Sequence, residues 1–159
     1  MRSHLITLII LIAVLVWTGM VAGISFLEAP IKFTAPQVTL AIGLGIGRLV
    51  FGWLNKCEIF FCAVMLTGLF FNRATMRVWV PALVVSMILF LQTTWLLPAL
   101  DIRALQIIAG QIPAPNNLHF IYIALDLIKL VMLLGTAVTV YKQQISHHPT
   151  MADLYLDKA

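Results

Sequence analysis

The sequence predicts an all-α integral membrane protein in which four helices cross the bilayer as a bundle. Of its 159 residues, 62% are hydrophobic and only 10% are charged, and the apolar residues fall into four long runs. This composition lies far outside that of soluble globular domains. Because one span needs about 20 mostly apolar residues, four spans and their connections use nearly the whole chain.

The first predicted span covers residues 5–27. This apolar run is longer than the hydrophobic region of a signal peptide, and no clear cleavage site closes it, so we expect it to remain as a membrane helix. Pro30 and Pro36 follow it and are expected to end the helix, because proline removes a backbone donor. The next helical element covers 39–71, of which 45–71 is the second predicted span.

The third predicted span, 78–97, follows a short polar turn and is expected to end at Pro98. A long connection, 101–117, comes next and is expected to hold one short interfacial helix around 102–109. With the proline-bearing connection after the first span, it gives the bundle two long outer connections.

The fourth predicted span covers 118–142, and a polar cytoplasmic tail, 143–159, follows it. Residues 1–142 therefore form a single four-span membrane domain. Each half of the chain contains a span, a proline-bearing connection and a returning span. Parallel repeats of this kind occur in transporters, although any up-and-down bundle of four helices gives a similar impression.

Basic residues predict the orientation and the location of the protein. The formal charge is +4, but the cations are scattered and form no stripe that would bind nucleic acid. Arg73 and Arg77 lie in the shortest loop, where the positive-inside rule is strongest, which places both termini inside. The inner side then also holds Arg2, Lys142 and Lys158, against Lys32, Arg48, Lys56 and Arg103 toward the outer side. We expect a multi-pass protein of the cell membrane, namely a bacterial inner membrane.

Two predicted spans carry polar and charged residues at membrane depth, where each is a functional candidate because its burial in lipid is costly. In the fourth span these residues are His119, Tyr122, Asp126 and Lys129. At about 100° per residue they occupy a sector of about 80° on the helix. The second span repeats part of this spacing with Arg48, Asn55 and Glu58.

The matching spacing predicts contacts between the second and fourth spans. Glu58 and Lys129 lie equally far from the predicted inner ends of their spans, so we predict that they form an ion pair. Exchanging their charges is then expected to impair the protein singly and to restore it partly in combination. By the same register, Asn55 is predicted to lie beside Asp126.

The two polar stripes allow two interpretations. They are interhelical contacts that fix packing in lipid, worth about 0.6 to 2 kcal/mol each, or they line a polar cavity between the second and fourth spans. In the second case Arg48 lies near His119 toward the outer mouth, within reach of Asp126. The outer connections then roof the cavity with Glu28, Lys32, Asp101 and Arg103. Such a cavity would bind a small polar or amphipathic ligand, pass protons, or hold a metal or haem.

Haem and copper are the weaker possibilities for this cavity. His119 is the sole histidine placed at a span, because His4 lies toward the opposite side of the membrane and His147 and His148 lie in the tail. Two histidine ligands across the bilayer have poor geometry. We therefore expect no metal and no cofactor, with His119 as the candidate ligand of the alternative.

Small and aromatic residues are assigned to packing. Gly19 with Gly23, and Gly43 with Gly47, form small-xxx-small patterns that permit close approach of helices, within one chain or in a homo-oligomer. Aromatic residues near the predicted interfaces are expected to anchor the spans, namely Trp17, Trp79, Trp95 and Tyr141.

The sequence Phe-Leu-Glu-Ala-Pro at 26–30, taken with the two polar stripes, resembles a family of four-helix bacterial inner-membrane proteins of unknown function. This family lies near the copper-resistance-D and protoporphyrinogen-oxidase-like (HemJ) groups. The resemblance covers most of the chain and implies a four-helix bundle in a bacterial inner membrane, without an activity. It implies no haem site, since the haem-binding members need a histidine in the first span.

A second resemblance involves Arg48, Asn55 and Glu58, whose spacing is similar to part of the glutathione-binding signature of the MAPEG enzymes of eicosanoid and glutathione metabolism. Gly47 and Phe51 stand where that signature has an acidic residue and a second arginine. The sequence therefore favours a non-enzymatic membrane protein that binds or passes a small solute, proton or ion. A membrane enzyme of the glutathione-transferase type and a haem or copper protein are the alternatives.

Overall fold

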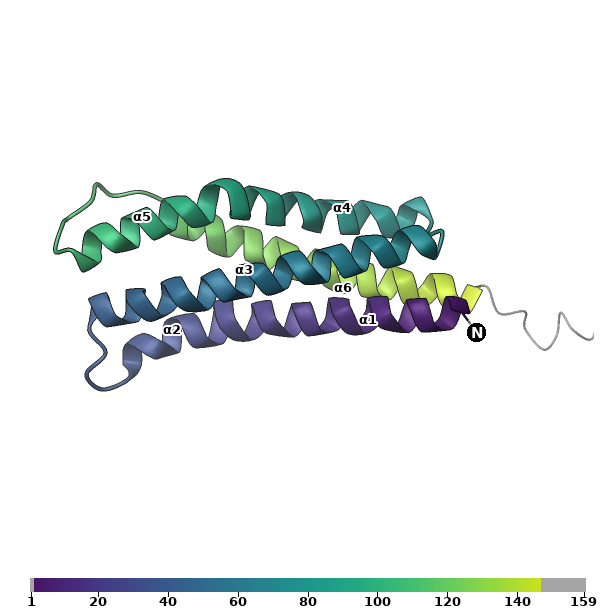
Figure 1. Cartoon of the computed structure of the whole chain (residues 1–159), viewed down its shortest axis with the longest axis horizontal. Helices are drawn as coiled ribbons and strands as arrows, with labels where there is room; N and C mark the ends of the chain where they lie inside the picture. Colours follow the sequence, from purple (N-terminus) through teal and green to yellow (C-terminus); the bar gives the residue numbers. More distant parts are fainter. Residues whose placement is uncertain (1, 147–159) are drawn as a thin grey trace, which may run out of the picture.

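The computed structural model is a bundle of four long helices over residues 2–146, the part of the chain that it describes (Figure 1). The helices are α1 (Arg2–Val21), α2 (Ala29–Ile31), α3 (Leu40–Phe71), α4 (Met76–Leu91), α5 (Leu97–Ile108) and α6 (Leu118–Ser146). Joined through short π-helical or 3-10 segments, they make four continuous helices of 29–33 residues that are long and apolar enough to cross a membrane. The predicted multi-pass membrane bundle is confirmed.

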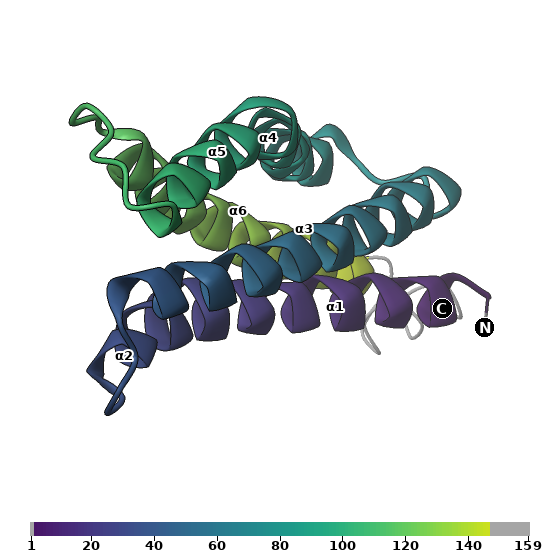
Figure 2. The same ribbon diagram turned by 60° about the vertical axis from the view of Figure 1, so that its left-hand side comes forward.

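The four spans pack as a closed ring of neighbours. α1 lies between α3 and α6, α4 packs on α6, and α5 packs on α3 (Figure 2). Both ends of the described chain lie at one end of the bundle, together with the turn between α3 and α4. We call this the termini end. The connections 35–39 and 109–117 lie at the opposite end, which we call the connection end.

The first span continues through Pro30, where the sequence predicted its end. A π-helical segment, Ala22–Glu28, precedes this proline, and the next backbone N–H bonds to the carbonyl oxygen of Ile24, one residue further back than in an α-helix. The wider turn accommodates the proline ring within the continuing helix. Helical structure therefore reaches Thr34, and the connection to α3 shortens to 35–39.

The third span likewise continues through Pro98 instead of ending there. A π-helical segment, Gln92–Leu96, precedes the proline, and the N–H of Leu97 bonds to the carbonyl oxygen of Gln92. The short helix predicted within 101–117 is therefore the last part of this span. The connection that follows is reduced to 109–117.

The second and fourth spans begin close to their predicted positions. The Thr39 side chain accepts a hydrogen bond from the N–H of Ile42 at 3.3 Å, which caps α3 at its first turn. The helix is α-helical throughout, including its glycine-rich first turns. α6 extends the fourth span past residue 142 to Ser146. Most of the predicted tail, with His147 and His148, lies outside the described residues.

The core and the outer faces of the bundle have the distribution expected in lipid. A cluster of buried apolar side chains fills the half of the bundle toward the termini end, including Ile10, Val14, Met65, Leu69, Val85, Leu89 and Leu133. Large apolar side chains also cover the outer faces of all four spans, including Leu8, Leu49, Phe90 and Val131. An apolar exterior of this extent is the surface that acyl chains contact.

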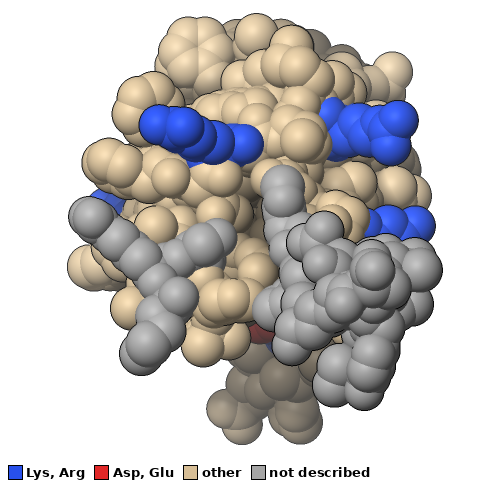
Figure 3. Space-filling view, turned by 90° about the vertical axis from the view of Figure 1, so that its right-hand side faces the viewer, with Lys and Arg blue, Asp and Glu red and all other residues tan. Residues whose placement is uncertain are grey.

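The termini end is basic. Figure 3 looks onto this end, where Lys and Arg side chains lie at several places and acidic side chains are barely visible. Arg73 lies in the turn after α3, Arg77 in the first turn of α4, and Lys142 near the end of α6. The connection end differs, because Lys32, Arg48 and Arg103 there are accompanied by two acidic residues, Glu28 and Asp101.

Glycine permits one close helix contact that the sequence patterns did not indicate. A Cβ atom added at Gly68 of α3 would lie 2.5 Å from Cγ1 of Ile10 in α1, whereas one added at Gly19 or Gly23 would meet nothing within 4 Å. The prediction of close approach at Gly19 and Gly23 is thus wrong for contacts within the described chain. At Gly43 and Gly47 it is the side chains of Phe33 and Lys32 that pack against α3.

Replacing Gly68 by valine is expected to destabilise the bundle by about 1–3 kcal/mol, because the new side chain overlaps buried Ile10 and forces α1 and α3 apart. Thermal unfolding in a mild detergent measures the effect. Gly19→Val is the matched control, since it introduces the same residue into a helix at an exposed position with nothing nearby. Equal losses in the two variants would show that the close contact at Gly68 does not contribute.

Candidate functional site

A cluster of three ionisable side chains lies fully buried near the middle of the bundle. Nζ of Lys129 is 2.5 Å from Oε1 of Glu58 and 2.9 Å from Oδ1 of Asp126. None of the three side chains is more than 1% exposed. The predicted ion pair between Glu58 and Lys129 is therefore present, and Asp126 extends it to a triad.

The first and third spans complete this cluster with neutral polar groups. Nε1 of Trp17 donates to Oε1 of Glu58 at 2.9 Å. Oε1 of Gln92 accepts from Lys129 at 2.7 Å, while its Nε2 donates to Oδ1 of Asp126 at 2.9 Å. All four spans thus meet in one polar layer, and each of the three protons of the Lys129 ammonium has an oxygen to face.

Sequence reasoning missed both neutral members of the layer. Trp17 was expected to anchor the first span at an interface, but its side chain is completely buried. Gln92 is the middle residue of the third span, Met76–Ile108. An amide at the centre of a long apolar run is the signal that could have found it, because such a group needs a partner at that depth.

The contacts with Asp126 that the sequence suggested for Asn55 and Arg48 are wrong, because both residues bond to the third span instead. Asn55 donates from Nδ2 to Oγ1 of Thr93 at 2.8 Å instead of contacting Asp126. Arg48 forms a bidentate ion pair with Asp101, with Nε 2.5 Å from Oδ1 and Nη2 3.0 Å from Oδ2. Both differences have the same cause, because the third span packs beside α3 at the levels of Arg48 and Asn55. Its continuation as α5 brings Asp101 within reach of Arg48.

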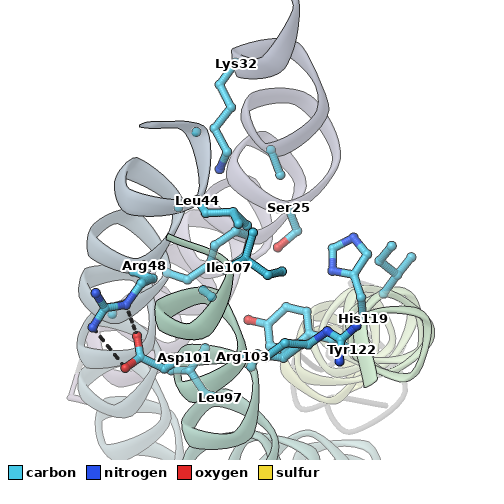
Figure 4. A pocket seen from close by; sticks show the side chains of 18 of the residues that line it. Ser25, Lys32, Leu44, Arg48, Leu97, Asp101, Arg103, Ile107, His119 and Tyr122 are labelled. Atoms are coloured by element: carbon cyan, nitrogen blue, oxygen red, sulfur yellow. Dashed lines mark hydrogen bonds and ion pairs between the residues drawn. The ribbon is translucent and has the colours of Figure 1, made fainter. Parts of the chain in front are cut away.

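A pocket of about 910 Å³ opens above this layer, at the connection end of the bundle (Figure 4). All four spans line it, whereas the sequence predicted a cavity between the second and fourth spans alone. The difference follows from the continued helices, because α2 and α5 carry the first and third spans past their prolines and around the cavity. Most of the wall is apolar, with Phe26, Leu44, Phe51, Leu97, Leu100 and Ile107 among the lining residues.

Several polar side chains border this apolar space. The side chains of Lys32 and His119 and the hydroxyl groups of Ser25 and Tyr122 point toward its centre (Figure 4). The oxygen of Ser25 is buried and has no hydrogen-bond partner within the described chain. The ammonium of Lys32 enters beside Gly47, whose missing side chain leaves room for it.

The charged residues predicted at the outer mouth do lie around this pocket, on helices rather than on loops. Lys32, Asp101 and Arg103 line it, and Glu28 contacts Nζ of Lys32 at 3.3 Å. Nη1 of Arg103 donates to the carbonyl oxygen of Ala114 in the following connection at 2.6 Å. Arg48 and His119 also line the same pocket, so the predicted nearness of these two residues to one mouth holds.

An aromatic pair separates the pocket from the charged layer. The rings of Phe51 and Tyr122 meet edge to face with centroids 5.5 Å apart, and both residues line the pocket. Asp126 follows Tyr122 by one helical turn on the same face of α6. The pocket therefore ends one turn above the charged cluster, and the apolar core closes the bundle on the other side.

The described residues contain no group of three or more His, Cys, Asp or Glu side chains that could hold a metal ion together. His119, the candidate ligand of the metal alternative, lies beside the ring of Phe120 with centroids 6.4 Å apart. Its position at the pocket mouth suits hydrogen bonding to a polar group in the pocket.

Comparison with known proteins adds no relative. No family model, no curated protein and no solved structure matches the chain. The resemblances to the inner-membrane family and to the MAPEG enzymes therefore stay predictions.

Proposed function

We propose that this protein binds a small amphipathic molecule with an acidic headgroup in the pocket at the connection end. The observation that carries the proposal is the pocket itself, which joins a mainly apolar space of about 910 Å³ to a mouth with an excess of cations. Pockets of roughly 300–1,000 Å³ with apolar walls and a few placed polar groups are typical of sites for small organic ligands.

The walls favour an apolar ligand body. Leu44 of α3 and two residues of α5, Leu97 and Ile107, converge on the same space, so a chain or ring placed among them loses contact with water on several sides. Burial of apolar surface contributes about 25 cal/mol per Å². A purely polar solute would gain nothing from these walls.

The mouth favours an anionic headgroup. Three cations, Lys32, Arg48 and Arg103, stand against Glu28 and Asp101. Arg48 is neutralised by its bidentate partner, and Arg103 donates to the carbonyl oxygen of Ala114. Lys32 has one ion pair, at 3.3 Å with Glu28, lies over the rings of Phe33 and Phe51, and points into the pocket. Lys32 is therefore the group that we assign to the ligand's negative charge, with His119 as a hydrogen-bonding neighbour.

The depth of the pocket suits a molecule that comes from the bilayer. Helices of 29–33 residues are about 44–50 Å long, which exceeds the roughly 30 Å of the hydrocarbon core. The charged mouth then lies among lipid headgroups while the apolar walls lie at acyl-chain depth. An amphipath partitioned into the membrane has the same arrangement of polar and apolar parts.

The same proposal includes an orientation and a location. The basic termini end is the cytoplasmic side according to the positive-inside rule, so the pocket opens toward the outer face of a bacterial inner membrane.

Binding is better supported than catalysis of the glutathione-transferase type. That alternative needs Arg48 and Glu58 together in one site. Here Arg48 lines the pocket and is bound to Asp101, while Glu58 lies in the buried layer beneath the aromatic floor. The two residues that carry the resemblance thus lie in different parts of the molecule.

A fluorescent long-chain fatty acid tests the proposal, with the purified protein in nanodiscs of zwitterionic lipid. We expect saturable binding at one site. Lys32→Met is expected to weaken binding about tenfold, which corresponds to about 1.4 kcal/mol, and Leu44→Trp is expected to abolish it by filling the pocket. Lys56→Met, which removes an equal charge from the lipid-facing surface, is expected to leave the affinity unchanged.

A fatty alcohol of the same chain length is the matched ligand control, and competition with the fluorescent acid measures its binding. It keeps the apolar body and loses the negative charge, so it should bind about tenfold more weakly to the unaltered protein and equally to Lys32→Met. Equal binding of acid and alcohol to the unaltered protein would contradict the assignment of the headgroup. Binding that persists in Leu44→Trp would contradict the pocket.

A further inference from the structure

The buried triad has an uneven charge count. Two carboxyl groups, Glu58 and Asp126, surround one ammonium, Lys129, so the ionised triad carries one net negative charge at the middle of a membrane bundle. Burying an uncompensated charge away from water is costly. Loss of a proton from Lys129 would enlarge the imbalance, whereas gain of one proton by a carboxylate removes it.

The groups that face the triad from the other elements do not supply the missing positive charge. α1 presents the neutral Trp17, and the third span presents the neutral Gln92. On α3 the thiol of Cys62 lies one turn further along and contacts Oγ of Ser86 at 3.3 Å. On α6 the next titratable group is the phenol of Tyr122 toward the pocket. Because none of these groups is a cation, protonation of one carboxylate is what removes the net negative charge of the layer.

Hydrogen bonding identifies the oxygen that can take this proton. Oδ1 of Asp126 accepts from both Lys129 and Gln92, while Oδ2 of the same carboxylate is buried and has no hydrogen-bond partner within the described chain. A proton added to Oδ2 neutralises the excess charge and breaks no existing bond. On Glu58, Oε1 likewise receives two donors, from Trp17 and Lys129, so the buried oxygen without a partner, Oδ2, is what distinguishes Asp126.

The path to this oxygen starts in the pocket. Tyr122 lies one helical turn from Asp126, lines the pocket floor and points its hydroxyl into the pocket. On the other side of the layer, completely buried apolar side chains fill the bundle, including Val14, Met65, Val85 and Leu133. Exchange of a proton between Asp126 and water is therefore easier from the connection end than from the termini end.

We propose that the buried triad is a proton-binding site, which holds one exchangeable proton on Oδ2 of Asp126 and is reached from the pocket past Tyr122. Uptake forms one O–H bond on a carboxylate, with the proton delivered by water, and requires no other reactant. A proton suits this position better than a metal cation, because a cation needs several oxygen ligands, and among the fully buried oxygens of the triad only Oδ2 of Asp126 lacks a hydrogen-bond partner within the described chain. The inference is independent of the identity of the ligand in the pocket.

Infrared difference spectroscopy of the protein in lipid nanodiscs tests the proposal directly. We expect a carbonyl band of a buried protonated carboxyl group at neutral pH that disappears as the pH is raised and shifts in heavy water. Asp126→Asn, an isosteric mimic of the protonated acid, should lose this band. Glu58→Gln should lose it too, because one carboxylate then balances Lys129. Asp101→Asn, which changes a half-exposed carboxylate at the mouth, should keep it.

Isotope labelling gives a second readout that needs no variant. Carbon-13 in aspartate carboxyl groups should shift the band of the unaltered protein, and carbon-13 in glutamate should not. A band that follows glutamate would place the proton on Glu58 and overturn the assignment to Asp126. Absence of any such band, or a band that persists unchanged in Glu58→Gln, would overturn the charge-balance argument. A band that is lost on adding sodium ions would identify a cation site instead.

Discussion

Replacing Lys129 by methionine is expected to cost about 3–5 kcal/mol of folding free energy. The substitution keeps the volume of the side chain but leaves Glu58 and Asp126 buried without a cation, and removing one partner of a buried ion pair has an effect of this size. The midpoint of unfolding in mild detergent, by heat or by added dodecyl sulfate, measures the loss. Lys142→Met is the control, because it removes an exposed cation from the same helix.

The stability lost in Lys129→Met should be recovered when the two unpaired charges are also removed. Adding Glu58→Gln and Asp126→Asn to Lys129→Met leaves no charge in the layer and is expected to recover most of the stability, since neutral groups of similar shape are often tolerated where a broken ion pair is not. If Lys129→Met is as stable as Lys142→Met, the ammonium of Lys129 does not hold the layer together.

The sequence was sufficient for the fold class because lipid imposes strong constraints. Four apolar runs at membrane length leave helices as the only spanning structure, since each backbone group must be satisfied within its own helix. Helix ends were predicted less well where prolines decided them. Pro30 and Pro98 end a regular α-helix, but the π-helical segments before them shift the hydrogen bonds by one residue, and nothing in the local composition indicated those segments.

This difference at the prolines determines the site. Without the continued helices α2 and α5, neither Lys32 nor Asp101 would stand beside α3, and the pocket would have two walls instead of four. Both π-helical segments also supply lining residues directly, through Ser25 and Thr93. A wider helical turn can therefore be both the means of passing a proline and the means of shaping a binding pocket.

The charged layer was predictable only in part. Periodicity placed Glu58 and Lys129 at equal depth on inward faces, and they form the expected ion pair. Spacing along one helix does not tell which neighbour lies on which side, so Asn55 was assigned to α6 although it contacts Thr93 of the third span. Gln92 was missed because no charged residue accompanies it in the predicted third span, 78–97, although it joins two members of the layer.

The anionic ligand proposed for the pocket and the proton proposed on Asp126 are expected to affect one another's binding through charge. The layer lies one helical turn below the pocket floor, with Tyr122 between Asp126 and the cavity. A proton on Asp126 removes negative charge beneath a site that we assign to an anion, so each occupant lowers the electrostatic cost of the other. The fatty acid should therefore bind more tightly to Asp126→Asn than to the unaltered protein at a pH high enough to ionise all three groups of the triad.

Exchanging the charges of Glu58 and Lys129 gives the sharpest test of the triad. Each single reversal, Glu58→Lys or Lys129→Glu, is expected to cost about 3–5 kcal/mol, because it sets like charges against one another in the buried layer. The sequence alone predicted partial restoration in the double variant. The structure predicts little, because a carboxylate introduced at position 129 lies three residues from Asp126 on the same face of α6.

Adding Asp126→Asn to the double exchange is expected to restore at least about 2 kcal/mol relative to either single reversal. The amide at position 126 no longer repels the new carboxylate, and the Gln92 side chain can turn its amide over so that Nε2 donates to position 129. Unfolding midpoints of the single, double and triple variants measure the effect. The matched control is the exchange of Arg48 and Asp101, whose half-exposed pair should change stability by no more than about 1 kcal/mol. A double exchange as stable as the triple variant would mean that Asp126 is not part of the triad, and that Glu58 and Lys129 act as a simple pair.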